Sequence, residues 1–174
     1  MNQFQHLAAR QVGHLPGLFR PAIMRDVPAI QRLIKLHADK GQMLPRSVNE
    51  LYETIRQYIL YEERGKVLGV CGLHVTWEDL AEVRALAVDP DHMGRGIGKL
   101  LVHQCLGEAR RLGIPKVFTL TYVPEFFRRL GFEEVEKTMF PHKIWSECIR
   151  CHKFPDCDET GLVILLDLNN DQAA

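Results

Sequence analysis

Three glycines stand at alternate positions, Gly94, Gly96 and Gly98, between two stretches of different periodicity. Residues 82–88 before them form an apolar, strand-like segment, and residues 99–112 after them carry apolar side chains at helical spacing. Glycine allows a positive φ and a close approach of a ligand to the backbone. Because the first N–H groups of a helix have no intrahelical partner, a unit of strand, glycine turn and helix can bind an anion. The stretch therefore predicts a pyrophosphate site in an α/β protein.

The spacing of the glycines separates three kinds of phosphate loop. The dinucleotide fingerprint needs G-x-G-x-x-G and an acidic residue about 20 residues on, and neither is present. The nucleotide P-loop needs a hydroxyl residue after its Gly-Lys pair, whereas Leu100 follows Gly98-Lys99 here. The run Met93-Gly94-Arg95-Gly96-Ile97-Gly98 resembles the acetyl-CoA loop of the GNAT acetyltransferases, [QR]-x-x-G-x-[GA]. It departs from that pattern only at Met93.

Composition limits the classes of protein to consider. The 174 residues predict a single domain over 19–168, with tails at 1–18 and 169–174. Lys+Arg and Asp+Glu both number 22, so no strong field favours nucleic acid or an anionic membrane as a partner. No apolar run approaches the roughly 20 residues of a membrane span. Five cysteines without a signal-like segment indicate a reducing, cytoplasmic setting. The sequence leaves the choice between a monomer and a homodimer open.

Periodicity and turn residues predict a mixed α/β order, β-α-α-β-β-β-α-β-α-β-β. Asp26 and Ser47 are predicted caps of the first two helices, the latter in a capping box with Glu50. The expected strands are 19–23, 59–62, 67–75, 81–88, 116–121, 132–136 and 162–168, and the later helices are 99–112 and 124–130.

That order, together with the loop and with Phe126-Phe127-Arg128-Arg129-Leu130-Gly131-Phe132, resembles the GNAT acyl-CoA N-acyltransferase fold, a mixed, twisted central sheet flanked by helices. Within this family, residues 41–47, 81–88, 117–121 and the Pro141-x-Lys143 segment resemble the acetyltransferase half of the N-acetylglutamate synthases. The resemblance implies acetyl transfer from acetyl-CoA to L-glutamate, the first step of arginine biosynthesis. It implies a short form without the amino-acid-kinase-like domain.

The resemblance implies an acetyl-CoA site built mostly from backbone. The amides of Met93, Gly94, Arg95, Gly96, Ile97, Gly98 and Lys99 would hold the pyrophosphate. The backbones of Leu86 and Val88 would pair with the pantetheine arm.

Acetyl transfer also needs a base for the amine and an acid for the thiolate. Glu82, at the start of the strand before the loop, is the candidate base; the alternative is a surface carboxylate at a strand end. Many family members place a Tyr acid where this chain has Phe127, which cannot donate a proton. Tyr122 or solvent would then supply the proton, and a packing role for Tyr122 stays equally open.

An acidic acceptor needs cations, and arginine grips a carboxylate through two parallel hydrogen bonds. The resemblance points to Arg46, and Arg84 shares a strand face with Glu82 because the two are two residues apart. Thr121 ends a strand beside the expected cleft. Lys143 and Arg150 fall in a C-terminal segment that closes over the amino acid in the family. For the cations, the alternative is a solvated surface position.

Cys148, Cys151 and Cys157 form C-x2-C-x5-C, with His142 and His152 nearby. A zinc site with three cysteines and one histidine, a disulfide, and free thiols that pack a loop are the alternatives, and we expect free thiols and no metal. Two other functions stay open: a GNAT enzyme for another amine, such as a protein N-terminus, a polyamine or a drug, and a non-catalytic acetyl-CoA-binding module.

Overall fold

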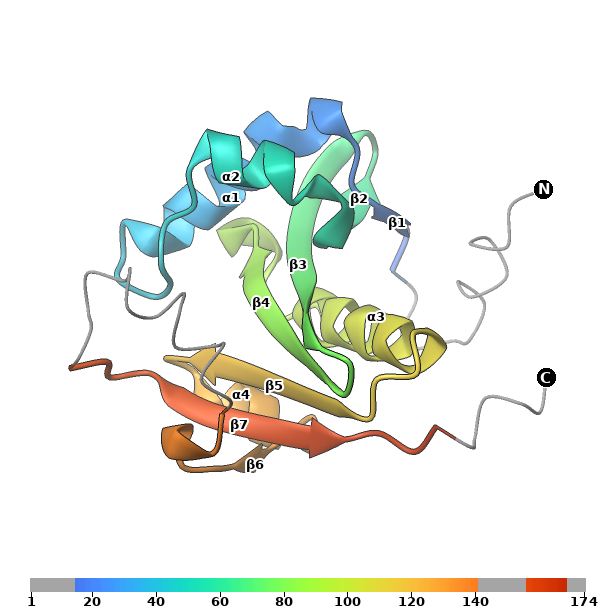
Figure 1. The fold of residues 1–174 in the computed structure, drawn as a ribbon. Coiled ribbons are helices and arrows are strands. Elements are labelled where there is room, and N and C mark those ends of the chain that lie inside the picture. Colours follow the sequence, from blue (N-terminus) through green and yellow to red (C-terminus); the bar gives the residue numbers. More distant parts are fainter. Residues whose placement is uncertain (1–14, 141–155, 169–174) are drawn as a thin grey trace.

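The computed structural model describes residues 15–140 and 156–168. Eleven strands and helices follow the predicted order, interrupted by short 3-10 turns (Figure 1). They are β1 (Leu18–Pro21), α1 (Val27–Ala38), α2 (Val48–Glu53), β2 (Tyr58–Glu63), β3 (Lys66–Trp77), β4 (Leu80–Val88), α3 (Ile97–Arg111), β5 (Lys116–Thr121), α4 (Pro124–Arg128), β6 (Glu133–Glu134) and β7 (Thr160–Leu165).

The strands form one mixed sheet in the order β1-β2-β3-β4-β5-β7-β6. All neighbours pair antiparallel except β4 and β5, which run parallel. Their ladder contains only three residue pairs and ends at Glu82 opposite Phe118. Beyond that point β4 stays paired with β3 and β5 with β7, so the two halves of the sheet separate.

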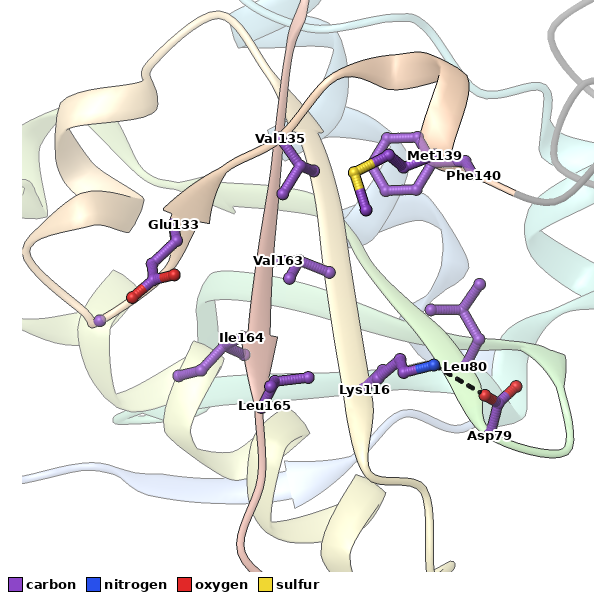
Figure 2. Close-up of a pocket in the computed structure, with 11 residues that line it drawn as sticks. Asp79, Leu80, Lys116, Glu133, Val135, Met139, Phe140, Val163, Ile164 and Leu165 are labelled. Carbon is purple, nitrogen blue, oxygen red and sulfur yellow. Dashed lines mark hydrogen bonds and ion pairs between the residues drawn. The ribbon is translucent and has the colours of Figure 1, made fainter.

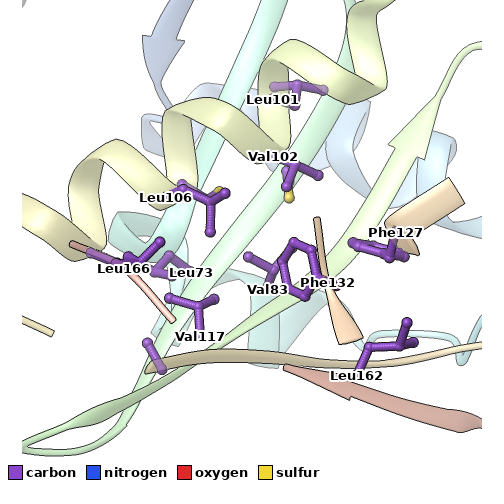
Figure 3. Close-up of a cluster of buried hydrophobic side chains, with 14 of the residues drawn as sticks. Leu73, Val83, Leu101, Val102, Leu106, Val117, Phe127, Phe132, Leu162 and Leu166 are labelled. Carbon is purple, nitrogen blue, oxygen red and sulfur yellow. The ribbon is translucent and has the colours of Figure 1, made fainter. Parts of the chain in front are cut away.

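Helices cover both faces of the sheet (Figure 1). On one face, α3 packs its buried side chains against β3, β4 and β5, and Phe127 and Phe132 extend this core from the α4 region (Figure 3). On the other face, α1 and α2 bury a second core against β2, β3 and the end of β4. The mixed sheet between helices confirms the predicted fold class.

Several element bounds differ from the sequence prediction. β1 ends at Pro21, before the expected Ile23, because the backbone turns into a 3-10 turn at Met24–Asp26. β7 begins at Thr160 and ends at Leu165, where the Leu166 N–H turns to bond the Pro115 carbonyl at 2.7 Å. β6 contains two residues instead of the expected five.

The two predicted caps have different outcomes. The Ser47 hydroxyl accepts from the Glu50 N–H at 3.2 Å, as a capping residue does. Asp26 stands before α1, but its carboxylate accepts from the Ile23 N–H at 2.8 Å and from the Arg20 guanidinium at 2.6 Å instead. The prediction that the Asp26 side chain caps α1 is therefore wrong, because its carboxylate is bound by the Arg20 guanidinium instead.

A bulge interrupts β4 before the glycine loop. Gly72 pairs with Arg84 and Val70 with Ala87, so β4 carries one extra residue between these pairs. Ala85 takes up the extra length with a φ of +53°, in the left-handed region that side chains other than glycine rarely adopt. The bulge keeps Arg84 and Ala87 on the face of the sheet covered by α1 and α2.

A close contact between a glycine and α3 sets the position of that helix. A Cβ added at Gly69 in β3 would lie 2.9 Å from Ile97 Cγ2 and 2.9 Å from Leu101 Cδ1. Both contacts are with buried side chains in the first half of α3, next to the glycine loop. Gly69 therefore lets the start of α3 approach the sheet.

We expect Gly69→Ala to destabilise the fold by about 1–3 kcal/mol, because a buried methyl group would push α3 away from β3. Gly107→Ala, in α3 itself, is the matched control. An added Cβ there meets only the far end of Arg111, 3.8 Å away, and removing a helical glycine should stabilise the protein by about 0.5–1 kcal/mol. Urea denaturation of both variants measures the difference, and an unchanged midpoint for Gly69→Ala would contradict the close packing.

Candidate functional site

The glycine loop is built as an anion cradle. Gly94 and Gly96 have φ of +78° and +85°, and a Cβ added to either would meet no atom of residues 15–140 or 156–168 within 4 Å. Gly96 is the residue that precedes α3, and no side chain of the described residues caps the helix there. The N–H groups of the first turn therefore stay available for a ligand, and the helix dipole favours negative charge beside them.

An interaction with β2 fixes the loop. Arg95 donates to the Glu63 carboxylate at 2.7 Å, and Tyr61 donates to the same oxygen at 2.8 Å. The Tyr61 hydroxyl in turn accepts from the Gly17 N–H at 3.1 Å. The hydrogen bond from Arg95 is the main cause of the lowered pKa of Glu63. The side chain of Arg95 thus holds the loop in place, while that of Met93 is 60% exposed.

The end of β4 leads into this loop along the gap that opens after Glu82. The Asp89 N–H bonds the Leu68 carbonyl at 2.8 Å. Since residues in an antiparallel ladder alternate in direction, the N–H and carbonyl of Val88 face away from β3. The Val88 carbonyl accepts from His37 Nε2 at 2.7 Å, and His37 Nδ1 lies 3.0 Å from the side-chain amide oxygen of Gln42. The side chains of Leu86 and Val88 pack towards α3.

Glu82 lies at the point where β4 and β5 separate, opposite His74 of β3. Arg84 lies on the same face, with its Nη1 3.8 Å from Glu82 Oε2. Arg84 Nη2 donates to the side-chain oxygen of Gln57 at 3.0 Å, and His74 Nδ1 is 3.2 Å from that oxygen. The structure brings Glu82 and Arg84 together as the sequence predicts. It also shows that Arg84 is only 7% exposed.

Arg46 joins this cluster from the loop between α1 and α2. Its guanidinium forms an ion pair with Glu50 and lies close enough to Tyr58 and Glu82 to interact electrostatically. Burial opposes the positive charge of Arg46, but the charge and hydrogen bond of Glu50, with smaller contributions from Tyr58 and Glu82, raise its pKa overall. Arg46 is therefore a firmly charged cation beside Glu82.

The end of β5 borders the same opening. Thr121 is buried and its hydroxyl accepts from the Val123 N–H at 3.0 Å, which shapes the turn into α4. Tyr122 follows it and is half-buried, with its hydroxyl oxygen shielded from solvent. Phe127 is 3% exposed and packs edge-on against Phe132, with ring centroids 5.3 Å apart. Phe127 therefore belongs to the core.

Some predicted residues lie outside the described residues: Lys143, Arg150, Cys148, Cys151, His142 and His152. Cys157 is described and half-buried, with its Sγ 3.8 Å from a Glu159 oxygen. Over residues 15–140 and 156–168, no group of three or more His, Cys, Asp or Glu residues is placed to hold a metal. Cys71 and Cys105 are fully buried in the core on the α3 side, as the sequence predicts.

A cavity of about 490 Å³ lies at the other end of the sheet (Figure 2). Its walls come from the starts of β4 and β5, from β7, and from Met139 and Phe140, with the Lys116–Asp79 ion pair of 3.1 Å at its edge. Leu80 in this cavity and Val88 before the loop are eight positions apart on β4, which is about 26 Å along an extended strand. The cavity is therefore separate from the glycine loop, whereas Leu80 in its wall is two residues from Glu82 on β4.

In the part of the chain that the structure describes, no helix has the length and apolar character needed to cross a bilayer.

The sequence does not predict that five further residues contribute to the site: His37, Gln42, Glu50, Gln57 and Tyr58. His37 and Gln57 reach the site only through the packing of α1 and a 3-10 turn against distant strands, and no local pattern indicates that. Tyr58 starts β2 in register with Gly72, where an added Cβ would lie 3.1 Å from the tyrosine ring. Only the Ser47–Glu50 capping spacing gave any local signal, and it concerns the helix end rather than the site.

Comparison with known proteins gives a consistent result. The Acetyltransferase (GNAT) domain family matches residues 54–134, which include Glu82 and the whole glycine loop. An uncharacterised N-acetyltransferase from Chlorobaculum tepidum is 40% identical over 144 residues, which is 83% of this chain and 93% of the relative. An amino-acid acetyltransferase from Mycobacterium tuberculosis is 38% identical over 157 residues, which is 86% of each chain.

Solved structures show the same architecture. A Mycobacterium tuberculosis protein in complex with CoA superimposes with a TM-score of 0.75 at 35% identity, covering 86% of this chain and 99% of that one. N-acetylglutamate synthase from Neisseria gonorrhoeae, complexed with coenzyme A and N-acetyl-glutamate, superimposes with a TM-score of 0.81 at 25% identity. That match covers 91% of this chain but 36% of the Neisseria chain.

Proposed function

Because the chain belongs to the GNAT acetyltransferase family, we propose that this acetyl-CoA-dependent enzyme acetylates the α-amine of L-glutamate. The observation that carries the proposal is the pairing of an open glycine cradle at one end of β4 with Glu82, Arg84 and Arg46 at the point where β4 leaves β5. The Neisseria synthase bound to coenzyme A and N-acetyl-glutamate supports glutamate as the acceptor. On this proposal the reaction is the first step of arginine biosynthesis, in the cytoplasm.

The residues fit acetyl-CoA. The amides from Met93 to Lys99 would hold the pyrophosphate, because the two left-handed glycines leave the cradle open. The arm would lie along β4 in the gap beyond Glu82, where β5 no longer pairs. The Val88 N–H would donate to the pantetheine arm, because the Val88 carbonyl already accepts from His37. The backbone of Leu86, two residues earlier, would also pair with the arm.

Glu82 would act as the general base. An ammonium group cannot attack a thioester, so the carboxylate must take a proton from the amine, directly or through water. The nitrogen then forms a bond to the acetyl carbon as the carbon–sulfur bond breaks. The thiolate takes a proton from Tyr122 or from solvent, because Phe127 occupies the core and has no proton to give. Arg46 would bind a carboxylate of the acceptor. Thr121 at the edge of the cleft and Arg84 beside Glu82 would be further contacts of the acceptor. Lys143 and Arg150, outside the described residues, are also proposed as acceptor contacts.

The experiment that tests the function is CoA release from acetyl-CoA with a panel of amines: L-glutamate, L-aspartate, L-glutamine, a polyamine and a peptide with a free N-terminus. We expect turnover with glutamate. Glu82→Gln should bind acetyl-CoA normally and lower kcat by roughly 10²–10⁴-fold, the usual contribution of general acid–base catalysis. Turnover with the polyamine or peptide alone would identify a different acceptor, and binding of acetyl-CoA without turnover on any amine would indicate a non-catalytic module.

Gly96→Ala should weaken acetyl-CoA binding. An alanine forced to a positive φ costs about 1–2 kcal/mol, and the loop would shift to relieve the strain. Gly113→Ala is the matched control, because Gly113 has a φ of +73° and equally open space but lies beyond the far end of α3.

Both glycine variants should lose similar stability in thermal melts, whereas only Gly96→Ala should raise the KM for acetyl-CoA, by roughly tenfold for the loss of one strong hydrogen bond. Equal KM values in the two variants would argue against the cradle.

Arg46→Ala should raise the KM for glutamate by roughly 10- to 100-fold, the effect of losing a charge-assisted hydrogen bond to a carboxylate. The KM for acetyl-CoA should stay near the wild-type value, because Arg46 lies on the α1–α2 loop and not on the glycine loop. Steady-state kinetics with each substrate varied in turn measure both constants. Equal increases in the two KM values would count against Arg46 as an acceptor contact.

A further inference from the structure

The cation proposed to bind the acceptor already has a carboxylate partner. Arg46 and Glu50 are four residues apart, on the loop before α2 and in its first turn, and their side chains form an ion pair. The side chain of Arg46 is 20% exposed and that of Glu50 is 35% exposed. The pair therefore stands at the rim of the cluster around Glu82, where an entering acceptor can reach it.

Glu50 is placed by its helix, independently of Arg46. The Ser47 hydroxyl accepts from the Glu50 N–H, and the Glu50 carbonyl accepts from the Thr54 hydroxyl at 2.6 Å. In a full capping box the Glu50 carboxylate would return to the Ser47 backbone. Here it turns to the Arg46 guanidinium. The Glu50 carboxylate is thus held by the helix against Arg46, a cation of the α1–α2 loop whose pKa Glu82 also raises.

Tyr58 supplies a second observation at the same place. Its side chain is 1% exposed, and its hydroxyl has no hydrogen-bond partner among the residues the structure describes. It is near enough to Arg46 to contribute to the raised pKa of that guanidinium. A phenol can both donate and accept, so its oxygen suits a guanidinium donor, whereas the hydroxyl proton of Tyr58 has no acceptor among the described residues. An acceptor carboxylate that displaced Glu50 would provide one.

We propose that Glu50 sets the affinity for the acceptor amino acid, because it occupies Arg46 in the empty site and competes with the carboxylate of the acceptor. This inference rests on the proposed function. When the acceptor binds, one guanidinium–carboxylate pair replaces another, so the acceptor gains only the difference between them. An amine without a carboxylate cannot release Arg46 from Glu50. The pair therefore lowers the affinity for an acceptor that binds Arg46 through a carboxylate.

The test is the steady-state kinetics of Glu50→Gln with L-glutamate. Glutamine keeps the size and the helix position but removes the charge. The KM for glutamate should fall by roughly two- to fivefold, the range expected when a partly exposed ion pair no longer opposes binding. The change should appear in the KM for glutamate and not in the KM for acetyl-CoA. Glu53→Gln is the matched control, because Glu53 lies on the same helix and pairs with Asn49 at 2.8 Å instead.

Each outcome decides the inference. A lower KM for glutamate in Glu50→Gln, with Glu53→Gln unchanged and both proteins folded by circular dichroism, supports it. An unchanged or higher KM overturns it, since Glu50 would then be a surface pair or would orient Arg46 for binding. Failure of the proposed function shows differently: the wild-type enzyme would release no CoA with glutamate, whatever residue stands at position 50.

Discussion

The site depends on the early end of the parallel ladder between β4 and β5. Only three pairs join these strands, after which β4 continues with β3 and β5 continues with β7. In a sheet, unpaired backbone groups cost free energy unless a partner supplies hydrogen bonds. The gap beyond Glu82 therefore both creates the opening and leaves a strand edge that an extended ligand can complete. The glycine loop at its end and the charged cluster at its start are useful because this gap connects them.

Charge in the cluster is almost fully paired within the protein. Arg84 lies against Glu82 and Gln57, and Arg46 lies against Glu50. Buried or half-buried cations need such partners, because desolvation penalises an isolated charge. The result is a site whose arginines are already oriented before an acceptor arrives. On the proposed function, recognition would be an exchange of partners, and its strength would depend on carboxylates of the protein as well as on those of the substrate.

Local patterns predicted the features that local physics determines. β5 matches its predicted bounds, since an apolar run between Pro115 and a turn allows little choice. The glycine turn follows from its spacing together with the strand pattern before it and the helix pattern after it. The bulge at Ala85 could not be predicted, because no glycine marks it in the sequence. The pairing of β4 with β3 on both sides of the bulge holds Ala85 in the left-handed conformation. The contact of His37 with the Val88 carbonyl spans 51 residues and arises from helix docking. Contacts of this kind depend on the assembled sheet and leave no periodic signal.

The hydrogen-bonded chain from Gly17 through Tyr61 and Glu63 to Arg95 has a wider meaning for this fold. It joins the backbone just before the outermost strand to the loop at the opposite side of β3. Loss of the Gly17 contact at that sheet edge would loosen the glycine loop, whereas this chain of hydrogen bonds includes neither Glu82 nor Arg84. The backbone before the first strand thus supports a loop that is distant in the sequence as well as bordering the sheet.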